Sequence, residues 1–181
     1  MAEFKHLTLE FPEPNVGLVT MNRPEVLNAV NTVMAGELRD VFSLAGTGEL
    51  SEISCLVLTG AGERAFSAGG DLKERNGMSN EQWQSQRVVF REYNRAQEAC
   101  PIPIVCAVNG LAMGGGLEMI MRSDFAYATE GIKFALPEIR HGFFPGSGGT
   151  QRLARLTSES RAKEVILSGE AFSAEEALEW G

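Results

Sequence analysis

The sequence predicts a single-domain α/β protein. Short strand patterns alternate with helical patterns along all 181 residues, and no linker or block of charge divides the chain. A strand followed by a glycine-rich loop and a helix occurs twice. With 44% hydrophobic and 22% charged residues, the chain can build a real hydrophobic core. In this class, ligand sites lie where glycine-rich loops leave strands and enter helices.

The first two elements are strands. Leu7, Leu9 and Phe11 alternate with polar residues, the sequence PEPN at 12–15 interrupts them, and VGLVTM at 16–21 resumes the pattern. A proline-rich break between two alternating segments predicts two strands joined by a turn.

A helix and a buried strand follow. Residues 31–46 have helical spacing of apolar side chains, at Val33, Leu38, Val41 and Leu44. The sequence ISCLVLT at 53–59 is almost continuously apolar, which predicts a strand buried on both faces.

The second half repeats this order. Ser79 and Gln82 have the spacing of a capping box, so a helix should begin there and run to Cys100. Its near-helical apolar positions predict core side chains rather than ligand contacts; they are Trp83, Phe90, Tyr93 and Ala96. The segments at 103–108 and 123–129 predict two further buried strands.

Composition excludes several function classes. A net charge of −8 without a basic stripe argues against nucleic-acid binding. No apolar run is long enough to span a membrane, and the N-terminus resembles neither a signal peptide nor a transit peptide, so we expect a cytoplasmic protein with no membrane partner. Three cysteines without a CxxC pair predict reduced thiols and no metal site.

Histidine chemistry has little support. The chain has two histidines, so a nucleophile activated by histidine could have at most one credible base. His141 is expected to be an exposed loop residue. Its position near Glu138 leaves open a role in reading the substrate.

A dinucleotide site is also disfavoured. Gly60, Gly62 and Ala65 match the pattern GxGxxA directly after a strand. The pattern requires a continuing helix, but Gly69 and Gly70 interrupt it, and the next strand with its acid is missing. Neither a phosphate-binding GxxxxGK[ST] loop nor a GxSxG motif is present.

Two glycine-rich segments remain, FSAGGDLKE at 66–74 and GLAMGGGLE at 110–118. Each glycine pair has a simpler explanation as a tight turn. Glu118, just behind three glycines, has the alternative role of an acid that stabilises a helix N-terminus. The residues alone leave both explanations open.

The order of several motifs resembles the enoyl-CoA hydratase/isomerase, or crotonase, family. The resemblance covers essentially the whole chain; the motifs are NRPEVLNAV, AFSAGGDLKE, VNGLAMGGGLEM, FALPEIRHGFFPGSGGTQRL and FSAEEALEWG. It implies a crotonase-like spiral of repeated ββα units, with residues 1–181 as the catalytic core. It also implies an acyl-CoA thioester substrate and no separate cofactor, because coenzyme A is part of the substrate.

The resemblance has one departure. Family members continue into C-terminal helices that build a trimer and part of the CoA pocket, whereas this sequence stops at Gly181. We therefore expect those helices to be absent from this chain or the sequence to be truncated. A homotrimer or homohexamer is expected only where those helices exist.

The resemblance also assigns the site. It implies that the backbone N–H groups of Gly70 and Gly115 hold the thioester oxygen, that Glu118 activates water and that Glu138 exchanges the proton at Cα. Substrate-binding positions are implied at Val26, Ala29, Ala68, Gly69, Asp71, Leu72, Lys73, Pro137 and Gly146. Arg23 and Lys73 are candidates for contact with the phosphates of CoA.

The primary functional hypothesis is an enoyl-CoA hydratase, which adds water reversibly to trans-2-enoyl-CoA and gives 3-hydroxyacyl-CoA. Two paired carboxyls suit this reaction, because one must take a proton from water and another must supply one to carbon. The alternatives are an enoyl-CoA isomerase, a carnitinyl-CoA-type dehydratase, or a shortened CoA-binding protein without turnover.

Overall fold

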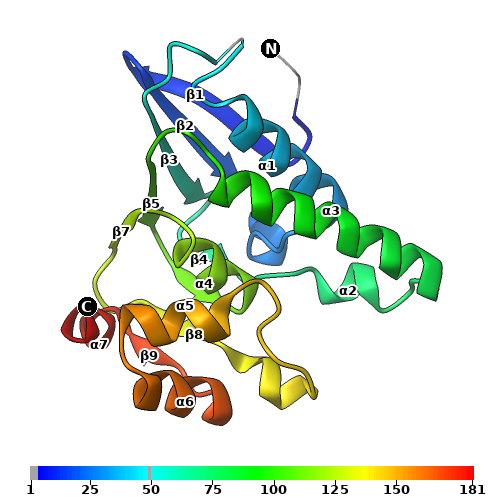
Figure 1. The fold of residues 1–181 in the computed structure, drawn as a ribbon, viewed down its shortest axis with the longest axis vertical. Coiled ribbons are helices and arrows are strands. Elements are labelled where there is room, and N and C mark those ends of the chain that lie inside the picture. Colours follow the sequence, from blue (N-terminus) through cyan, green and yellow to red (C-terminus); the bar gives the residue numbers. More distant parts are fainter. Residues whose placement is uncertain (1–3, 49) are drawn as a thin grey trace.

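The computed structural model describes residues 4–48 and 50–181. Its strands form two sheets, ordered β1-β2-β3-β5-β7 and β4-β6-β8-β9. The strands are β1 (Leu7–Glu13), β2 (Val16–Met21), β3 (Cys55–Gly60), β4 (Ala65–Ser67), β5 (Ile104–Val108), β6 (Leu111–Met113), β7 (Phe125–Ala128), β8 (Lys133–Ala135) and β9 (Phe172–Ser173). Strand β1 and helix α6 lie toward opposite ends of the long axis, and the C-terminal end lies beside α7 (Figure 1).

Helices follow the strands in a repeating order. They are η1 (Pro24–Val26), α1 (Thr32–Leu44), α2 (Leu72–Arg75), α3 (Asn80–Glu98), α4 (Gly115–Ile120), η2 (Pro137–His141), α5 (Gly149–Leu156), α6 (Glu159–Ser168) and α7 (Ala174–Trp180). In each later ββα unit the first strand, β3, β5 or β7, joins the large sheet, and the second, β4, β6 or β8, joins the small one. The predicted spiral of ββα units is confirmed.

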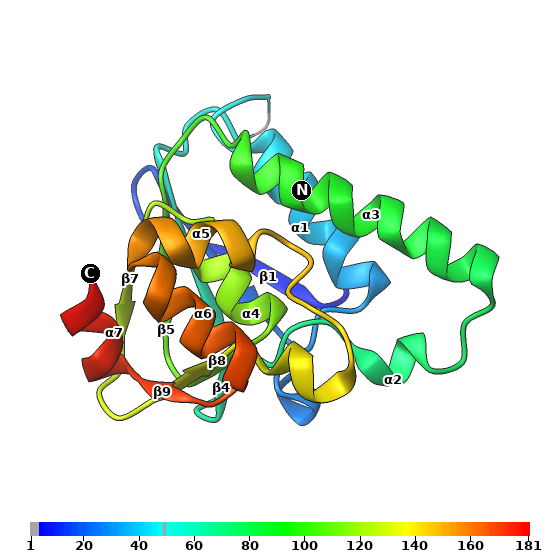
Figure 2. The ribbon, with the colours of Figure 1, turned by 60° about the horizontal axis from the view of Figure 1, so that its bottom comes forward.

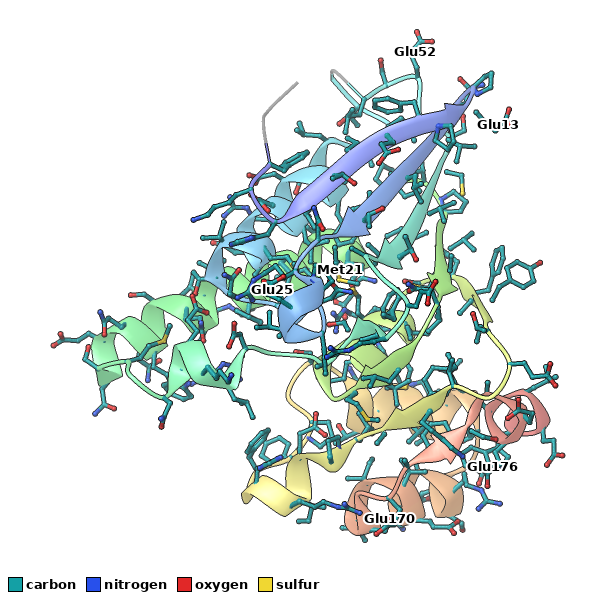
Figure 3. The ribbon with its side chains drawn as sticks, turned by 180° about the vertical axis from the view of Figure 1, so that it is seen from behind. Glu13, Met21, Glu25, Glu52, Glu170 and Glu176 are labelled. Atoms are coloured by element: carbon teal, nitrogen blue, oxygen red, sulfur yellow. The ribbon has the colours of Figure 1, made fainter. Side chains whose placement is uncertain are left out.

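The large sheet packs on helices through one face. β1 and β2 are antiparallel, with Leu7 opposite Met21, and the later strands join in parallel. Helices α1 and α3 lie behind this sheet in Figure 3, on one side only. Burying each large apolar side chain between the layers contributes about 1.5–3 kcal/mol.

This one-sided packing corrects one prediction. β3 is not buried on both faces: Leu56 and Leu58 are fully buried, while the alternating residues Cys55, Val57 and Thr59 are partly exposed. Because helices cover one face of the sheet, only alternate residues of a central strand reach the core.

Both predicted long helices are present. Asn31 precedes α1, and its side chain accepts the N–H of Met34. Leu38 and Val41 are in the core as their spacing suggests, but Val33 and Leu44 are exposed, because the buried stripe also includes Met34, Ala35 and Phe42.

The capping box of α3 is confirmed. The hydroxyl of Ser79 accepts the N–H of Gln82, and the side chain of Gln82 accepts the N–H of Ser79. The reciprocal pair satisfies two N–H groups that would lack partners at a helix start.

The prediction that residues 123–129 form a buried strand is wrong. β7 ends the large sheet, and all four of its residues are exposed, including Phe125 and Tyr127. An apolar sequence predicts a strand but does not determine whether that strand lies at the centre or the edge of its sheet.

The small sheet and the last helices complete the molecule. Helices α4, α5 and α6 pack together beside the small sheet (Figure 2). After Gly62 the chain enters β4 rather than a helix, so the GxGxxA pattern lacks the context of a dinucleotide site, as expected. Within the described ranges, no helix combines the length and hydropathy needed to cross a bilayer.

Candidate active site

A cleft of about 1000 Å³ lies among α2, α3, α4 and η2. In Figure 2, η2, drawn in yellow, lies beside α2. Most predicted site residues line this cleft: Ala68, Gly69, Gly70, Leu72, Gly115, Glu118, Pro137, Glu138 and Gly146. The others, which do not line it, are Val26, Ala29, Asp71 and Lys73.

Two backbone N–H groups come together in the cleft. Gly70 follows β4 and Gly115 begins α4, yet a Cβ built on Gly115 would lie 3.5 Å from the nitrogen of Gly70. The flanking peptides are fixed, because the Val30 N–H donates to the Gly69 carbonyl (2.8 Å) and the Asp71 N–H donates to the Val30 carbonyl (2.9 Å). Neither Gly70 nor Gly115 donates to an acceptor within residues 4–48 and 50–181, so both N–H groups are available to a ligand.

The neighbouring glycines are required by close approach. Gly114 has φ +51°, and a Cβ there would lie 3.0 Å from Oε1 of Glu138. A Cβ on Gly116 would overlap the carbonyl oxygen of Ser67, where α4 packs on β4. The run of glycines therefore lets a helix start against the end of a strand while a carboxyl group lies over it.

Glu118 is held by a loop across the cleft. Its side chain is buried, and Oε1 accepts the N–H groups of Ser147 (2.7 Å) and Gly149 (2.8 Å). A buried carboxylate needs such donors. Oε2 has no hydrogen-bond partner among the described residues, which leaves it for a bound molecule. The carboxylate thus does more than stabilise the N-terminus of its own helix.

Glu138 lies in the short helix η2 and faces a different environment. It is buried, and its Oε2 lacks any partner in the described part of the chain. Burial, together with the nearby charge of Glu118, raises the pKa of Glu138 from 4.5 to about 7. A carboxyl with a pKa near neutrality can both give and accept a proton at working pH.

A buried arginine supports the loop that holds Glu118. Arg122 donates from Nη1 to the Ser147 carbonyl (2.7 Å), from Nη2 to the Tyr93 hydroxyl (2.7 Å) and from Nε to Oε1 of Gln97 (3.0 Å). Sequence reasoning missed Arg122 and Ser147. The available signal was a cation four residues after Glu118 in an otherwise apolar stretch.

Asp71 and Arg23 stabilise the fold around the cleft. Oδ1 of Asp71 accepts the first N–H groups of α2, from Lys73 and Glu74, and Oδ2 pairs with Arg23 at 2.8 Å. These contacts engage both carboxylate oxygens of Asp71 but only Nη1 of Arg23, whose Nε and Nη2 have no acceptor among the described residues. Lys73 is exposed at the start of α2.

The aromatic residues of α3 all line the cleft but differ in exposure; they are Trp83, Phe90 and Tyr93. Tyr93 is buried as expected, but Trp83 is 40% exposed and lines the cleft, so its assignment to the core is wrong. α3 extends beyond the sheet at its N-terminal end, which exposes its first turns. His141 is exposed, as expected, and stacks on Phe143 with 6.0 Å between ring centroids.

The chemistry of the cleft is that of acids and hydrogen-bond donors. Within the described ranges, no group of three histidine, cysteine or acidic residues could hold a metal ion. The fold and the site define an α/β protein of ββα repeats with two glutamates beside a pair of free backbone N–H groups.

Comparison with known proteins identifies the family. The family model for enoyl-CoA hydratase/isomerase matches residues 12–181. The short-chain-enoyl-CoA hydratase of Clostridium acetobutylicum is 38% identical over 99% of this chain, and the mitochondrial enoyl-CoA hydratase of Pongo abelii is also 38% identical over 99%. The chain belongs to the enoyl-CoA hydratase/isomerase family.

Solved structures agree with this assignment. The crystal structure of an enoyl-CoA hydratase from Bacillus anthracis superposes with a TM-score of 0.92 at 38% identity, over 98% of this chain and 68% of that one. This chain spans 67% of the Clostridium protein and 61% of the Pongo protein.

Proposed function

We propose that the protein is an enoyl-CoA hydratase, which adds water reversibly to trans-2-enoyl-CoA and gives 3-hydroxyacyl-CoA. The observation that carries the proposal is the placement of two buried glutamates, Glu118 and Glu138, in one cleft with the unpaired N–H groups of Gly70 and Gly115. Membership of the family and the names of its relatives support the same reaction.

The donors would act on the thioester oxygen. Addition of water at Cβ produces an enolate whose negative charge lies on that oxygen. Two fixed N–H donors stabilise the charge as it forms, and one such donor is typically worth about 10²- to 10³-fold in rate.

The glutamates would divide the proton transfers. Glu118, with Oε1 held by two N–H groups, takes the proton of water through Oε2. Glu138, with its raised pKa, supplies the proton at Cα. Each positioned carboxyl can contribute about 10²- to 10⁴-fold.

Other properties belong to the same proposal. We propose that acyl-CoA thioesters bind in this cleft without a further cofactor and that residues 1–181 provide the catalytic core. A cytoplasmic location and a role in fatty acid metabolism are likewise proposed, as is assembly into trimers or pairs of trimers where the C-terminal helices exist. Val26, Ala29 and Lys73 are proposed to reach bound CoA from outside the cleft lining.

The test separates hydration from movement of a double bond. Loss of conjugated enoyl-thioester absorbance is followed with crotonyl-CoA, and its appearance with 3-hexenoyl-CoA. Glu118→Gln should lower hydration by about 10²-fold or more and leave measurable isomerisation, whereas Glu138→Gln should suppress both.

Glu179→Gln provides the control, because Glu179 is exposed on α7 and does not line the cleft. Hydration of crotonyl-CoA by Glu118→Gln at the wild-type rate would contradict the assignment of water activation to Glu118, and a wild-type protein that does not hydrate crotonyl-CoA would contradict the hydratase. Isomerisation without hydration in the wild-type protein would instead support the isomerase alternative.

A further inference from the structure

A second charged group lies next to the proposed oxyanion donors. Arg75 is the last residue of α2 and lines the cleft. Its guanidinium packs on Gly70, where an added Cβ would lie 2.9 Å from Nη2. Gly70 in turn adjoins Gly115, so Arg75 lies at the centre of the site rather than at its rim.

The guanidinium is held in a fixed orientation. Nε donates to Oε1 of Gln86 at 3.0 Å, and the guanidinium lies over the ring of Phe90, 5.1 Å from its centroid. Gln86 is itself buried, and its Nε2 donates to Thr32 Oγ1 (2.8 Å) and Glu74 Oε2 (2.7 Å). One of the five N–H groups of Arg75 is thereby used, and the Nη1 and Nη2 edge is left free.

The charge of Arg75 has no carboxylate partner in the described part of the chain. No ion pair includes it, and its Nη atoms have no acceptor there. The nearest acids are engaged elsewhere: Glu74 with Gln86 and the N–H of Thr32, and Asp71 with Arg23. Burial lowers the pKa of Arg75, which means that keeping its guanidinium charged costs free energy. In a chain with net charge −8, this pattern indicates a ligand that supplies the missing anion.

We propose that Arg75 binds a carboxylate carried on the acyl group, so that the preferred substrates are enoyl-CoA thioesters with a second carboxyl group. The proposal rests on the hydratase function proposed above. A guanidinium with a free Nη edge suits bidentate binding of a carboxylate. The carbon chain of a five-carbon diacid spans about 5 Å at ordinary bond lengths, which suits an anion site directly beside the thioester donors.

The test compares substrates that differ in this carboxylate. Values of kcat/KM are measured with glutaconyl-CoA and crotonyl-CoA, and dissociation constants with their saturated analogues, glutaryl-CoA and butyryl-CoA. Arg75→Met should lower the glutaconyl-to-crotonyl ratio of kcat/KM by about 10- to 100-fold, the usual effect of a charged hydrogen bond. The binding preference for glutaryl-CoA over butyryl-CoA should fall by a similar factor.

Arg87→Met is the matched control. Arg87 lines the same cleft but stacks on Trp83, 4.8 Å from the ring centroid, so its loss should leave both ratios as in wild type. An equal loss with both members of a pair would place Arg75 on CoA phosphates or on the thioester and overturn the proposal. Unchanged ratios in Arg75→Met, or the same change in Arg87→Met, would also overturn it.

The two readouts separate this proposal from the hydratase proposal. If wild-type protein binds glutaryl-CoA preferentially through Arg75 but hydrates neither substrate, the carboxylate subsite stands and the hydratase function fails. Hydration of crotonyl-CoA without any preference for the diacid thioesters gives the opposite result.

Discussion

Glu138, the residue proposed to supply a proton to the substrate, also lowers the stability of the folded protein. Its ordinary pKa is 4.5 and its pKa in the folded protein is about 7, because burial disfavours the charged form and Glu118 repels it. The folded protein therefore binds a proton more tightly here than the unfolded chain does. Stability must fall as pH rises from about 4.5 to about 7.

Glu138→Gln should remove this penalty, because the amide is neutral at every pH. The variant should be more stable than wild type at pH 8, by up to about 3 kcal/mol, and the two should converge near pH 4.5. Urea unfolding at pH 5 and pH 8 measures the difference, with Glu179→Gln as a control at an exposed position. A variant that retains the wild-type dependence on pH would show that Glu138 does not carry the penalty.

At the scale of elements, the loop between η2 and α5 holds α4 in position through hydrogen bonds to Glu118 and Arg122. The Ser147 N–H donates to Oε1 of Glu118, and the Ser147 carbonyl accepts from Nη1 of Arg122, four residues further along the chain from Glu118. Since Arg122 also binds Tyr93 and Gln97 of α3, one side chain links three elements.

Arg122→Met should loosen this loop. We expect kcat to fall by about 10-fold with KM little changed, because Glu118 loses its alignment while the cleft keeps its walls. Unpaired groups left on Ser147, Tyr93 and Gln97 should also cost about 1–3 kcal/mol of stability.

Steady-state kinetics and urea unfolding measure both effects, and Arg122→Lys should restore part of the activity. Arg155→Met, at an exposed position of α5, is the control. A change in KM without any change in kcat would contradict the alignment role.

The positions of helices and strands could be predicted from the sequence better than the burial of their side chains. The caps at Asn31 and Ser79 are local, so the sequence locates the starts of α1 and α3 correctly. Burial, in contrast, depends on which other elements pack against a residue. Nothing within residues 123–129 reveals that β7 has a partner on one side only, and nothing near Trp83 reveals that the start of α3 extends past the sheet.

At the scale of the whole molecule, the site is assembled from separate ββα units. Gly70 belongs to the second unit, Gly115 and Glu118 to the third and Glu138 to the fourth. Sequence periodicity alone could locate each glycine-rich loop, but it could not predict that these loops lie close together in space. The resemblance to a family supplied that step, whereas the contacts of Arg75 and Arg122 depend on the tertiary structure.

The exposed strand β7 has a consequence for how the protein behaves in solution. Its side chains Phe125 and Tyr127 are 52% and 74% exposed, at the open edge of the large sheet. A net charge of −8 keeps copies apart at low ionic strength, but salt screens that repulsion and leaves the apolar edge unchanged.

Light scattering should therefore detect stronger self-association at 0.5 M NaCl than at 0.02 M. Tyr127→Lys should reduce that increase, since a charged residue on an edge strand opposes pairing. A scattering signal independent of salt in both proteins would mean that this edge does not promote self-association.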